Sequence, residues 1–148
     1  VLGDEASACW VGRLALQRTL ETVDARLAAS ALSDALLAEF NDSAGIVQFA
    51  SKARPSDFGA LAPRVTAYAK DGDTIASNIM QLGAAEIARA LRCLGWQHTQ
   101  AVCLTGGIGP EFPPYLPEDI RSRIIAPMGT PLDGAVALAH AFAQEVKE

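Results

Sequence analysis

The sequence has few aromatic residues, no long apolar run and no cluster of basic residues. Only 6% of the 148 residues are Phe, Trp or Tyr, and no 18-residue stretch is apolar throughout, so no membrane-spanning segment and no membrane partner are expected. The sequence has no charged region followed by an apolar stretch, so no secretory signal is expected. This favours a cytoplasmic location. Lys and Arg are scattered and the formal net charge is −5, which argues against a nucleic-acid partner.

Cysteine and histidine are also scarce. Cys9, Cys93 and Cys103 are too far apart for the paired ligands of a zinc site or for a disulfide framework. His98 and His140 have no nearby Cys or second His. The residues therefore predict free, buried thiols in a reducing compartment and no metal site.

Alanine, in contrast, occurs 28 times, and half of the residues are hydrophobic. This composition favours closely packed helices in one compact domain, which a chain of this length can form without a disulfide or metal. The sequence begins with Val1-Leu2 and runs directly into a turn, as the end of a strand would. We therefore expect one domain of a longer protein.

Apolar periodicity and turn residues predict mainly helices. The expected helices cover residues 4–26, 33–40, 43–50, one continuous segment from 55 to 68, 73–94, 117–123 and 131–146. The clearest boundary is Asp71-Gly72-Asp73, where Gly72 can adopt a positive φ and Asp73 can cap the next helix. Small residues in the last helix predict close packing.

Two short apolar segments are typical of strands. Residues 100–104 are bounded by a glycine pair, as expected for a buried strand of an α/β sheet, and residues 124–127 fit a short edge strand. The residues thus predict a helix-rich α/β domain with few strands of its own.

A glycine-rich turn follows the first of these strands, at residues 104–109. Glycines there would let the backbone approach a ligand without a Cβ clash. The spacing matches neither the dinucleotide fingerprint nor the P-loop. Taken alone, the pattern favours an ordinary tight strand-to-helix turn over a nucleotide-binding loop.

A second group of interest is Gly3-Asp4-Glu5-Ala6-Ser7. Asp4 and Ser7 at a helix start favour capping, since carboxylates and hydroxyls accept hydrogen bonds from the exposed N–H groups. A carboxylate that accepts hydrogen bonds from a polyhydroxylated substrate is the functional alternative. No nucleophile–base set accompanies it, so we predict no catalytic residue within this chain.

Four segments resemble, in order, the motifs of one known family. Residues 1–13 are similar to its G-D-E-G-S-x-x-W-I-G-R segment, with Ala6 in place of the usual glycine. Residues 58–63 with 71–73 resemble its helical segment, 102–107 its adenosine motif and 127–135 its closing P-x-x-x-P-x-x-G-A stretch. The chain thus resembles, over essentially its whole length, the BadF/BadG/BcrA/BcrD-type ATPases, which include N-acetylglucosamine kinases and glucosamine kinases.

The resemblance implies both a fold and an activity. The fold would be a helix-rich, ribonuclease-H-like α/β lobe with a small sheet, as in the actin, Hsp70 and sugar kinase superfamily. Residues 1–148 would form the C-terminal, nucleotide-binding lobe of a two-lobed kinase whose N-terminal lobe is absent from this chain. The activity would be ATP-dependent phosphorylation of N-acetylglucosamine or glucosamine, with ATP and Mg²⁺ as cofactors. Its partners would be the amino sugar, the nucleotide and, as in many family members, a second copy.

The resemblance also implies roles for six residues. Asp4 would accept hydrogen bonds from sugar hydroxyls, and Gly3 would let the backbone approach the sugar. The nucleotide would contact the segment Thr105-Gly106-Gly107, with the two glycines against adenosine or the α-phosphate, while Ala60 would face the base or ribose.

The catalytic base, the phosphate loops and the magnesium-associated acid would lie before Val1. The isolated chain is therefore expected to be inactive.

Two rival interpretations remain at this stage. One is an ATPase that activates an acyl-CoA reductase or dehydratase through an iron–sulfur cluster, although the three cysteines lack the usual ligand spacing. The other is a non-catalytic helical α/β interaction domain whose glycines are ordinary turns. The residues also leave open whether the amine of the sugar is free or acetylated.

Overall fold

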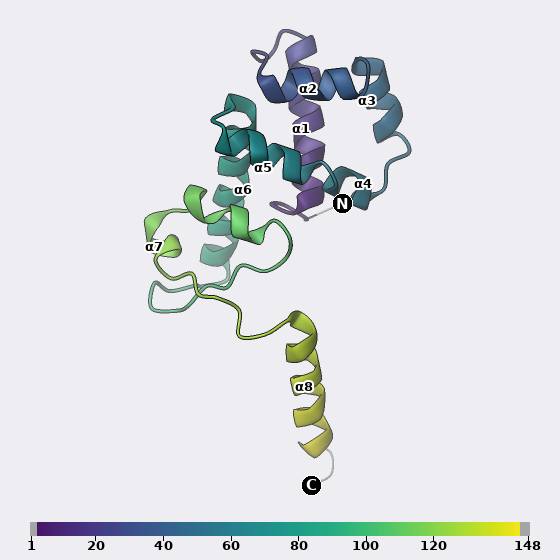
Figure 1. The fold of residues 1–148 in the computed structure, drawn as a ribbon. Helices are drawn as coiled ribbons and strands as arrows, with labels where there is room; N and C mark the ends of the chain where they lie inside the picture. Colours follow the sequence, from purple (N-terminus) through teal and green to yellow (C-terminus); the bar gives the residue numbers. More distant parts are fainter. Residues whose placement is uncertain (1–2, 146–148) are drawn as a thin grey trace.

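A computed structural model describes residues 3–145, which form helices connected by loops (Figure 1). The elements are α1 (Ala8–Val23), α2 (Ala31–Glu39), α3 (Ser43–Ala50), α4 (Pro55–Gly59), α5 (Ala62–Lys70), α6 (Thr74–Cys93), the 3₁₀ helices η1 (Gly109–Glu111) and η2 (Pro113–Tyr115), α7 (Glu118–Arg121) and α8 (Pro131–Glu145). The predicted strand end at Val1-Leu2 and the predicted helix end at Val146 lie outside the described residues.

Helix α1 is the centre of the helical body and packs against α2, α4, α5 and α6. Its buried side includes Val11 and Ala15, both completely inaccessible to solvent. At Gly12 a Cβ atom would lie 1.9 Å from the carbonyl oxygen of Phe58, so only glycine lets α4 cross α1 at this distance. This close crossing brings the start of α1 and the end of α4 into the same region.

Asp73 caps two helices with one carboxylate, which confirms the predicted turn at residues 71–73. Its Oδ1 accepts hydrogen bonds from the Ala76 N–H at 2.9 Å and the Ser30 hydroxyl at 3.0 Å, and its Oδ2 accepts the Leu32 N–H at 2.9 Å. Gly72 has φ +83°. Burial alone would raise the pKa of the Asp73 carboxyl, but these hydrogen bonds outweigh it and hold the pKa below its usual value.

The prediction of one continuous helix from Pro55 through Tyr68 is wrong. The chain ends α4 at Gly59 and starts α5 at Ala62. Pro63 lies in the first turn of α5, where its missing N–H leaves no intrahelical bond unmade. The proline therefore begins a new helix instead of bending an old one.

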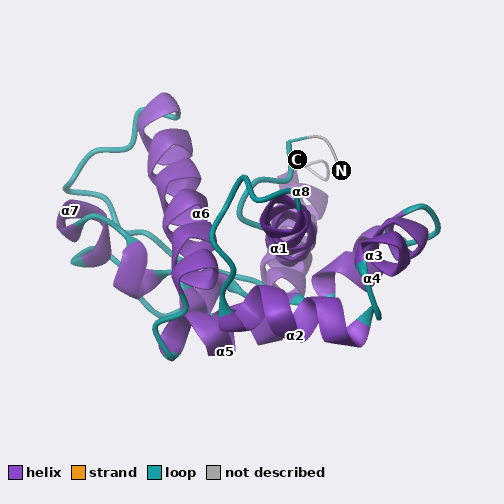
Figure 2. Cartoon of the chain, turned by 90° about the horizontal axis from the view of Figure 1, so that it is seen from above, coloured by secondary structure: helices purple, strands orange, loops and turns teal. Residues whose placement is uncertain are grey.

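The predicted sheet is not present within the described residues. Figure 2 shows helices and loops without a strand in that part of the chain, and the two apolar segments meet in one parallel bridge between Val102 and Ile124. The Val102 N–H donates to the Arg123 carbonyl, and the Ile125 N–H donates to the Val102 carbonyl, both at 2.9 Å. Two short extended segments need further strands to form a stable sheet, and residues 3–145 do not supply them.

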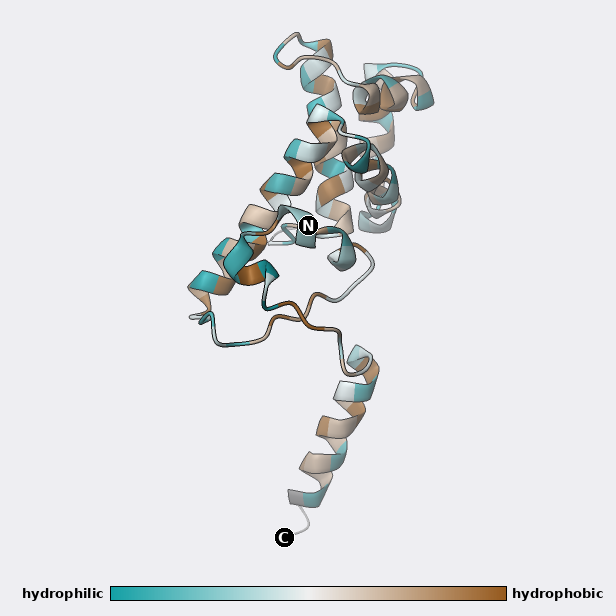
Figure 3. Ribbon diagram, turned by 60° about the vertical axis from the view of Figure 1, so that its left-hand side comes forward, coloured by the Kyte–Doolittle hydropathy of each residue, from teal (hydrophilic) through white to brown (hydrophobic). Residues whose placement is uncertain are grey.

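Helix α8 extends away from the other helices (Figures 1 and 3). Its described side chains, from residue 131 to residue 144, are all exposed, so the predicted close packing of its small residues is absent from this structure. In the first turn of α8, Asp133 accepts hydrogen bonds from the N–H and hydroxyl of Thr130, both at 2.8 Å. These bonds lower the pKa of the Asp133 carboxyl.

The predicted burial of the thiols is wrong for two of the three cysteines. Cys9 is partly buried, whereas Cys93 and Cys103 are exposed, and all three are free. Cys93 is the last residue of α6, and Cys103 follows the buried Val102 in an extended segment, where successive side chains point to opposite sides. Within the described residues, no helix combines the length and apolar character needed to cross a bilayer.

Candidate functional site

A turn with two left-handed residues leads into α1. Gly3 has φ +67° and Ala6 has φ +65°. A residue with a Cβ is strained in this conformation, which gives a physical reason for the glycine that the resembling family carries at the position of Ala6. Ala6 is 7% exposed, so its burial offsets part of the strain.

Asp4 is held at this turn by Ser7. The Ser7 Oγ accepts the Trp10 N–H at 3.0 Å, which makes Ser7 the N-cap of α1, and the Ser7 hydroxyl donates to Asp4 Oδ2 at 2.7 Å. Asp4 therefore orients the capping hydroxyl but does not cap the helix itself. A carboxylate has about four acceptor directions, so the half-buried Asp4 can still accept hydrogen bonds from a ligand.

The glycine loop forms an open backbone surface. Gly106 has φ +82°, and a Cβ at either Gly106 or Gly107 would have no atom within 4 Å. Thr105 is exposed beside them. The loop then closes into η1 through a hydrogen bond of 3.2 Å from the Gly109 N–H to the Gly106 carbonyl. Such a loop can present backbone N–H groups to a bound anion without side-chain obstruction.

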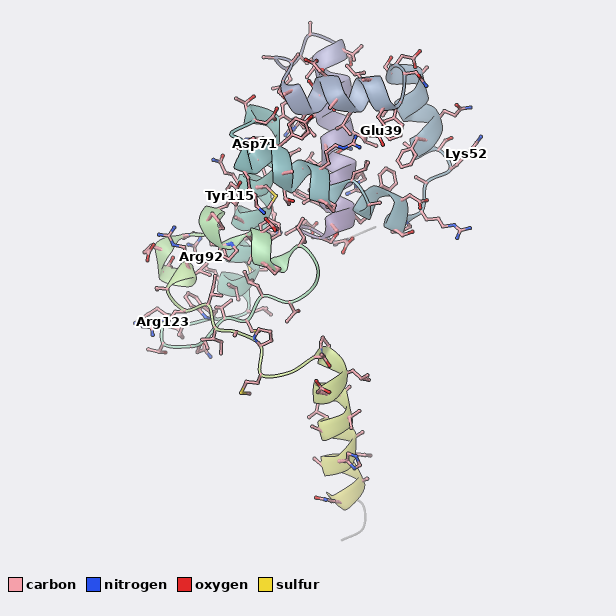
Figure 4. The ribbon with its side chains drawn as sticks, in the orientation of Figure 1. Glu39, Lys52, Asp71, Arg92, Tyr115 and Arg123 are labelled. Atoms are coloured by element: carbon pink, nitrogen blue, oxygen red, sulfur yellow. The ribbon has the colours of Figure 1, made fainter. Side chains whose placement is uncertain are left out.

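Three cavities lie in a row past these two loops. The front cavity lies between residues 5–8 and 103–109. The middle cavity, of about 280 Å³, lies between α4–α5 and the glycine loop, and its lining includes Gly59, Ala62, Thr66, Gly107 and Glu111. The rear cavity continues along α5 to Tyr115, which Figure 4 labels.

Shared lining residues join the three cavities into one groove. Ala8, Gly107 and Ile108 line both the front and the middle cavity. Thr66 and Glu111 line both the middle and the rear cavity. The groove therefore runs from the N-terminal turn, past the glycine loop, to η1 and α5.

Three of the six predicted site residues line this groove, and the other three lie close in the sequence to residues that line it. Thr105, Gly106 and Gly107 line the front cavity. Asp4 directly precedes the residues that form the opposite wall of that cavity, Glu5 to Ser7. Gly3 is exposed at the start of the turn.

Ala60 lies beside the groove. It is exposed, and its neighbour Gly59 provides the lining of the middle cavity. The predicted contact of Ala60 with a nucleotide stays a prediction, and the residue of this segment that lines the groove is Gly59.

Sequence reasoning did not identify Thr66, Lys70 and Glu111. The Lys70 Nζ lies 2.7 Å from Glu111 Oε2, and the two residues are 41 positions apart, so no local pattern predicts the pair. A weaker signal exists for Glu111, which lies two residues after the glycine-rich turn that the sequence singles out at residues 104–109. Residues 3–145 bring no three His, Cys, Asp or Glu side chains together as a metal site.

Comparison with known proteins shows which proteins the chain is similar to. No protein-family model matches the sequence. The chain is 27% identical to the glucosamine kinase GspK of Vibrio cholerae over 139 residues, a match that covers 93% of the chain. It is also 32% identical to a crystal structure of a putative N-acetylglucosamine kinase from Chromobacterium violaceum, with a TM-score of 0.81 over 91% of the chain.

The chain is thus similar, over nearly its whole length, to proteins named as glucosamine and N-acetylglucosamine kinases. It spans about half the length of the relatives it matches, because each match covers 47% of the other protein. The structural agreement confirms that these kinase-like helices, and the loops they position, form a shared fold. The groove is therefore the candidate functional site, and the N-terminal turn and the glycine loop form its front end.

Proposed function

We propose that this chain is the nucleotide-binding half of an enzyme that transfers phosphate from ATP to an amino sugar, N-acetylglucosamine or glucosamine. The observation that carries the proposal is the groove, which joins the Asp4 turn and the glycine loop in one continuous surface. Two kinase-like relatives, one named for glucosamine and one for N-acetylglucosamine, support the choice of substrate class.

The middle part of the groove fits a nucleotide. Its walls are mainly apolar, with Ala62 and Pro63 on one side and Ile108 on the other, and such a slot suits the flat faces of a purine. Gly107 lies where this slot meets the front cavity, and its open backbone can approach a ribose or phosphate. ATP bound in this way would direct its phosphates into the front cavity.

Asp4 is our candidate for the sugar-binding residue of this half. It directly precedes Glu5 and is hydrogen-bonded by Ser7, and both of these residues line the front end of the groove, where the terminal phosphate of ATP would lie. The Ser7 hydroxyl fixes the Asp4 carboxylate, so its remaining lone pairs are preorganised for sugar hydroxyl donors. Gly3, exposed beside Asp4, would leave the backbone open to the same sugar.

Phosphoryl transfer depends mainly on positioning and charge neutralisation, with a carboxylate that accepts the proton of the attacking hydroxyl. We propose that this chain positions the two substrates and that the base comes from the other half of the enzyme. Mg²⁺ would neutralise phosphate charge when bound, and we propose that its protein ligands also belong to the other half of the enzyme.

We propose further that residues 1–148 are the C-terminal lobe and that a second lobe covers α8. The exposed apolar residues of α8 support this, because at 3.6 residues per turn they fall on one side of the helix. They are Leu132, Val136, Leu138 and Phe142, which are 47–74% exposed. A lone helix of this length is marginal in water, so burial of that side would stabilise it. The small sheet of a ribonuclease-H-like lobe would likewise need strands from further chain.

Thermal unfolding of the full-length protein tests the nucleotide part of the proposal. ATP and ADP should raise the melting temperature, since a ligand at 100 times its Kd adds about 2.7 kcal/mol of stability. Glucosamine and N-acetylglucosamine are the second arm, and at least one of them should add a further increase. The absence of a shift with either nucleotide would contradict the kinase assignment and favour a non-catalytic interaction domain.

A further inference from the structure

Glu111 occupies a distinctive place in the groove. Together with Thr66 it lines both the middle and the rear cavity, at the end of the middle cavity opposite the segment shared with the front cavity. Glu111 is the last residue of η1, and the next residue, Phe112, is 1% exposed and anchors this end of the loop in the core. The carboxylate is therefore presented to the groove from a fixed backbone.

The direction of a bound nucleotide follows from the order of the cavities. If the phosphates point into the front cavity, beside Gly107 and the turn that carries Asp4, the base must lie deeper in the middle cavity. The polar groups at that deeper end are Thr66 and Glu111. This step rests on the proposed function, because the proposed sugar site sets the direction of the phosphates.

The polar groups at this end present acceptors. The Lys70 ammonium binds Glu111 Oε2 at 2.7 Å, which fixes the carboxylate and leaves Oε1 able to accept a hydrogen bond from a ligand. The Thr66 hydroxyl donates to the Pro63 carbonyl at 3.0 Å, so its proton is already used. Thr66 is 8% exposed. A ligand acceptor placed against it would find no hydrogen-bond donor, which would cost binding free energy.

We propose that Glu111, positioned by Lys70, selects adenine nucleotides by accepting a hydrogen bond from the 6-amino group of the base. Adenine carries an N–H₂ donor at this position, whereas hypoxanthine and guanine carry a carbonyl oxygen. The carbonyl oxygen would then face the Glu111 carboxylate, and because both groups are hydrogen-bond acceptors, they could not form a hydrogen bond. Hydrogen bonds to charged groups are among the stronger ones, so the expected discrimination between ADP and IDP is about ten-fold or more in Kd.

Titration calorimetry of the full-length protein with ADP, IDP and 2′-deoxy-ADP tests this assignment. The wild-type protein should bind ADP about ten-fold more tightly than IDP and bind 2′-deoxy-ADP nearly as well as ADP. Glu111→Gln should reduce the ADP/IDP ratio to about three or less, because an amide can accept from an amino group or donate to a carbonyl. Lys70→Met should reduce it in the same direction by releasing the carboxylate.

Glu21→Gln is the matched control. Glu21 is also paired with a basic side chain at 2.7 Å, that of Arg18, and its side chain is 27% exposed, compared with 29% for Glu111. Glu21 lies near the end of α1, away from the start of α1 that lines the groove. The ADP/IDP ratio should not change in this variant.

The outcomes separate the inference from the function on which it rests. Equal binding of ADP and IDP by the wild-type protein, or an unchanged ratio in Glu111→Gln, would overturn the role of Glu111 and leave nucleotide binding intact. If the wild-type protein binds 2′-deoxy-ADP more weakly than ADP and Glu111→Gln abolishes that difference, Glu111 contacts the ribose, which also overturns the inference. Failure of the wild-type protein to bind either diphosphate would overturn the proposed function itself. The wild-type comparison remains decisive if a variant does not fold.

Discussion

Gly83 on α6 makes room for the ring of Phe112. A Cβ at position 83 would lie 2.7 Å from Cε1 and 3.0 Å from Cζ of that ring, which is buried against α6. Phe112 directly follows Glu111 at the end of η1. The missing side chain at position 83 therefore determines how deeply the end of the glycine loop is anchored, and it connects the packing of the core to the shape of the groove.

Gly83→Ala is expected to destabilise the protein by about 1–3 kcal/mol, because an added methyl group in a filled site forces the ring to move. Because Glu111 directly precedes Phe112, movement of the ring should displace the Glu111 carboxylate, and ADP affinity should fall as well. Chemical denaturation and calorimetry measure the two effects. Gly134→Ala in α8 is the control: a Cβ there has no atom within 4 Å, and the change should be neutral or stabilise by up to about 1 kcal/mol. Unchanged stability and affinity in Gly83→Ala would contradict the anchoring role of Phe112.

Asp73→Ala should lower the stability at pH 7 by about 1–2 kcal/mol, because one carboxylate caps both α2 and α6. The pKa of this carboxyl is lowered by folding, so its contribution is complete above the unfolded-state value and is lost as the pH falls through the lower folded-state value. The difference between wild type and variant should therefore shrink below about pH 4. Urea unfolding at several pH values measures it.

Asp71→Ala is the control for this experiment. Asp71 lies two residues earlier, is exposed and ends α5 through its backbone N–H. A loss as large as that of Asp73→Ala would mean that charge near the turn, and not the double cap, stabilises the protein.

Asp4→Ala and Ser7→Ala separate sugar binding from capping. In the full-length enzyme, Asp4→Ala should lower kcat/KM for the amino sugar by about ten-fold or more while ATP binding changes little, since charge-assisted hydrogen bonds to sugar hydroxyls are lost. Ser7→Ala removes the N-cap of α1 and should cost about 1 kcal/mol of stability with a smaller effect on the sugar. If the two variants show the same kinetics, or if Asp4→Ala affects sugar and ATP equally, Asp4 acts through the cap alone.

The isolated 148-residue chain is expected to release no ADP from ATP and amino sugar, because the proposed base and metal ligands lie outside it. A coupled ADP-release assay compares the chain with the full-length protein at equal concentration. Turnover by the chain alone would contradict the proposed division of the enzyme into two halves.

Local signals predicted most of the helices. Asp73 after Gly72, and Gly95 with φ +77° after α6, mark helix ends through backbone preferences that operate within a few residues, and the structure confirms both. Pro63 was misinterpreted because a proline in a first turn and a proline at a bend have the same local pattern. Close to the break between α4 and α5, the crossing of α4 over α1 at Gly12 is a long-range contact that the local pattern does not reveal.

The remaining errors concern partners beyond the local sequence. Residues 100–104 are as apolar as a buried strand, but a strand needs neighbours, and in the described residues Val102 finds only Ile124. Resemblance to a known family is what singles out the N-terminal turn and the glycine loop as candidate ligand-binding segments. The pairing of Lys70 with Glu111 depends on α5 meeting η1 in space, so a single sequence could not reveal it.

We propose that this chain belongs to an enzyme that phosphorylates an amino sugar. The most direct test is ADP release by the full-length protein in the presence of ATP and Mg²⁺, with glucosamine, N-acetylglucosamine or no sugar. We expect ADP release that depends on at least one of the two sugars, with the sugar phosphate as the second product. Absence of sugar-dependent ADP release with both sugars, in a folded protein, would contradict it.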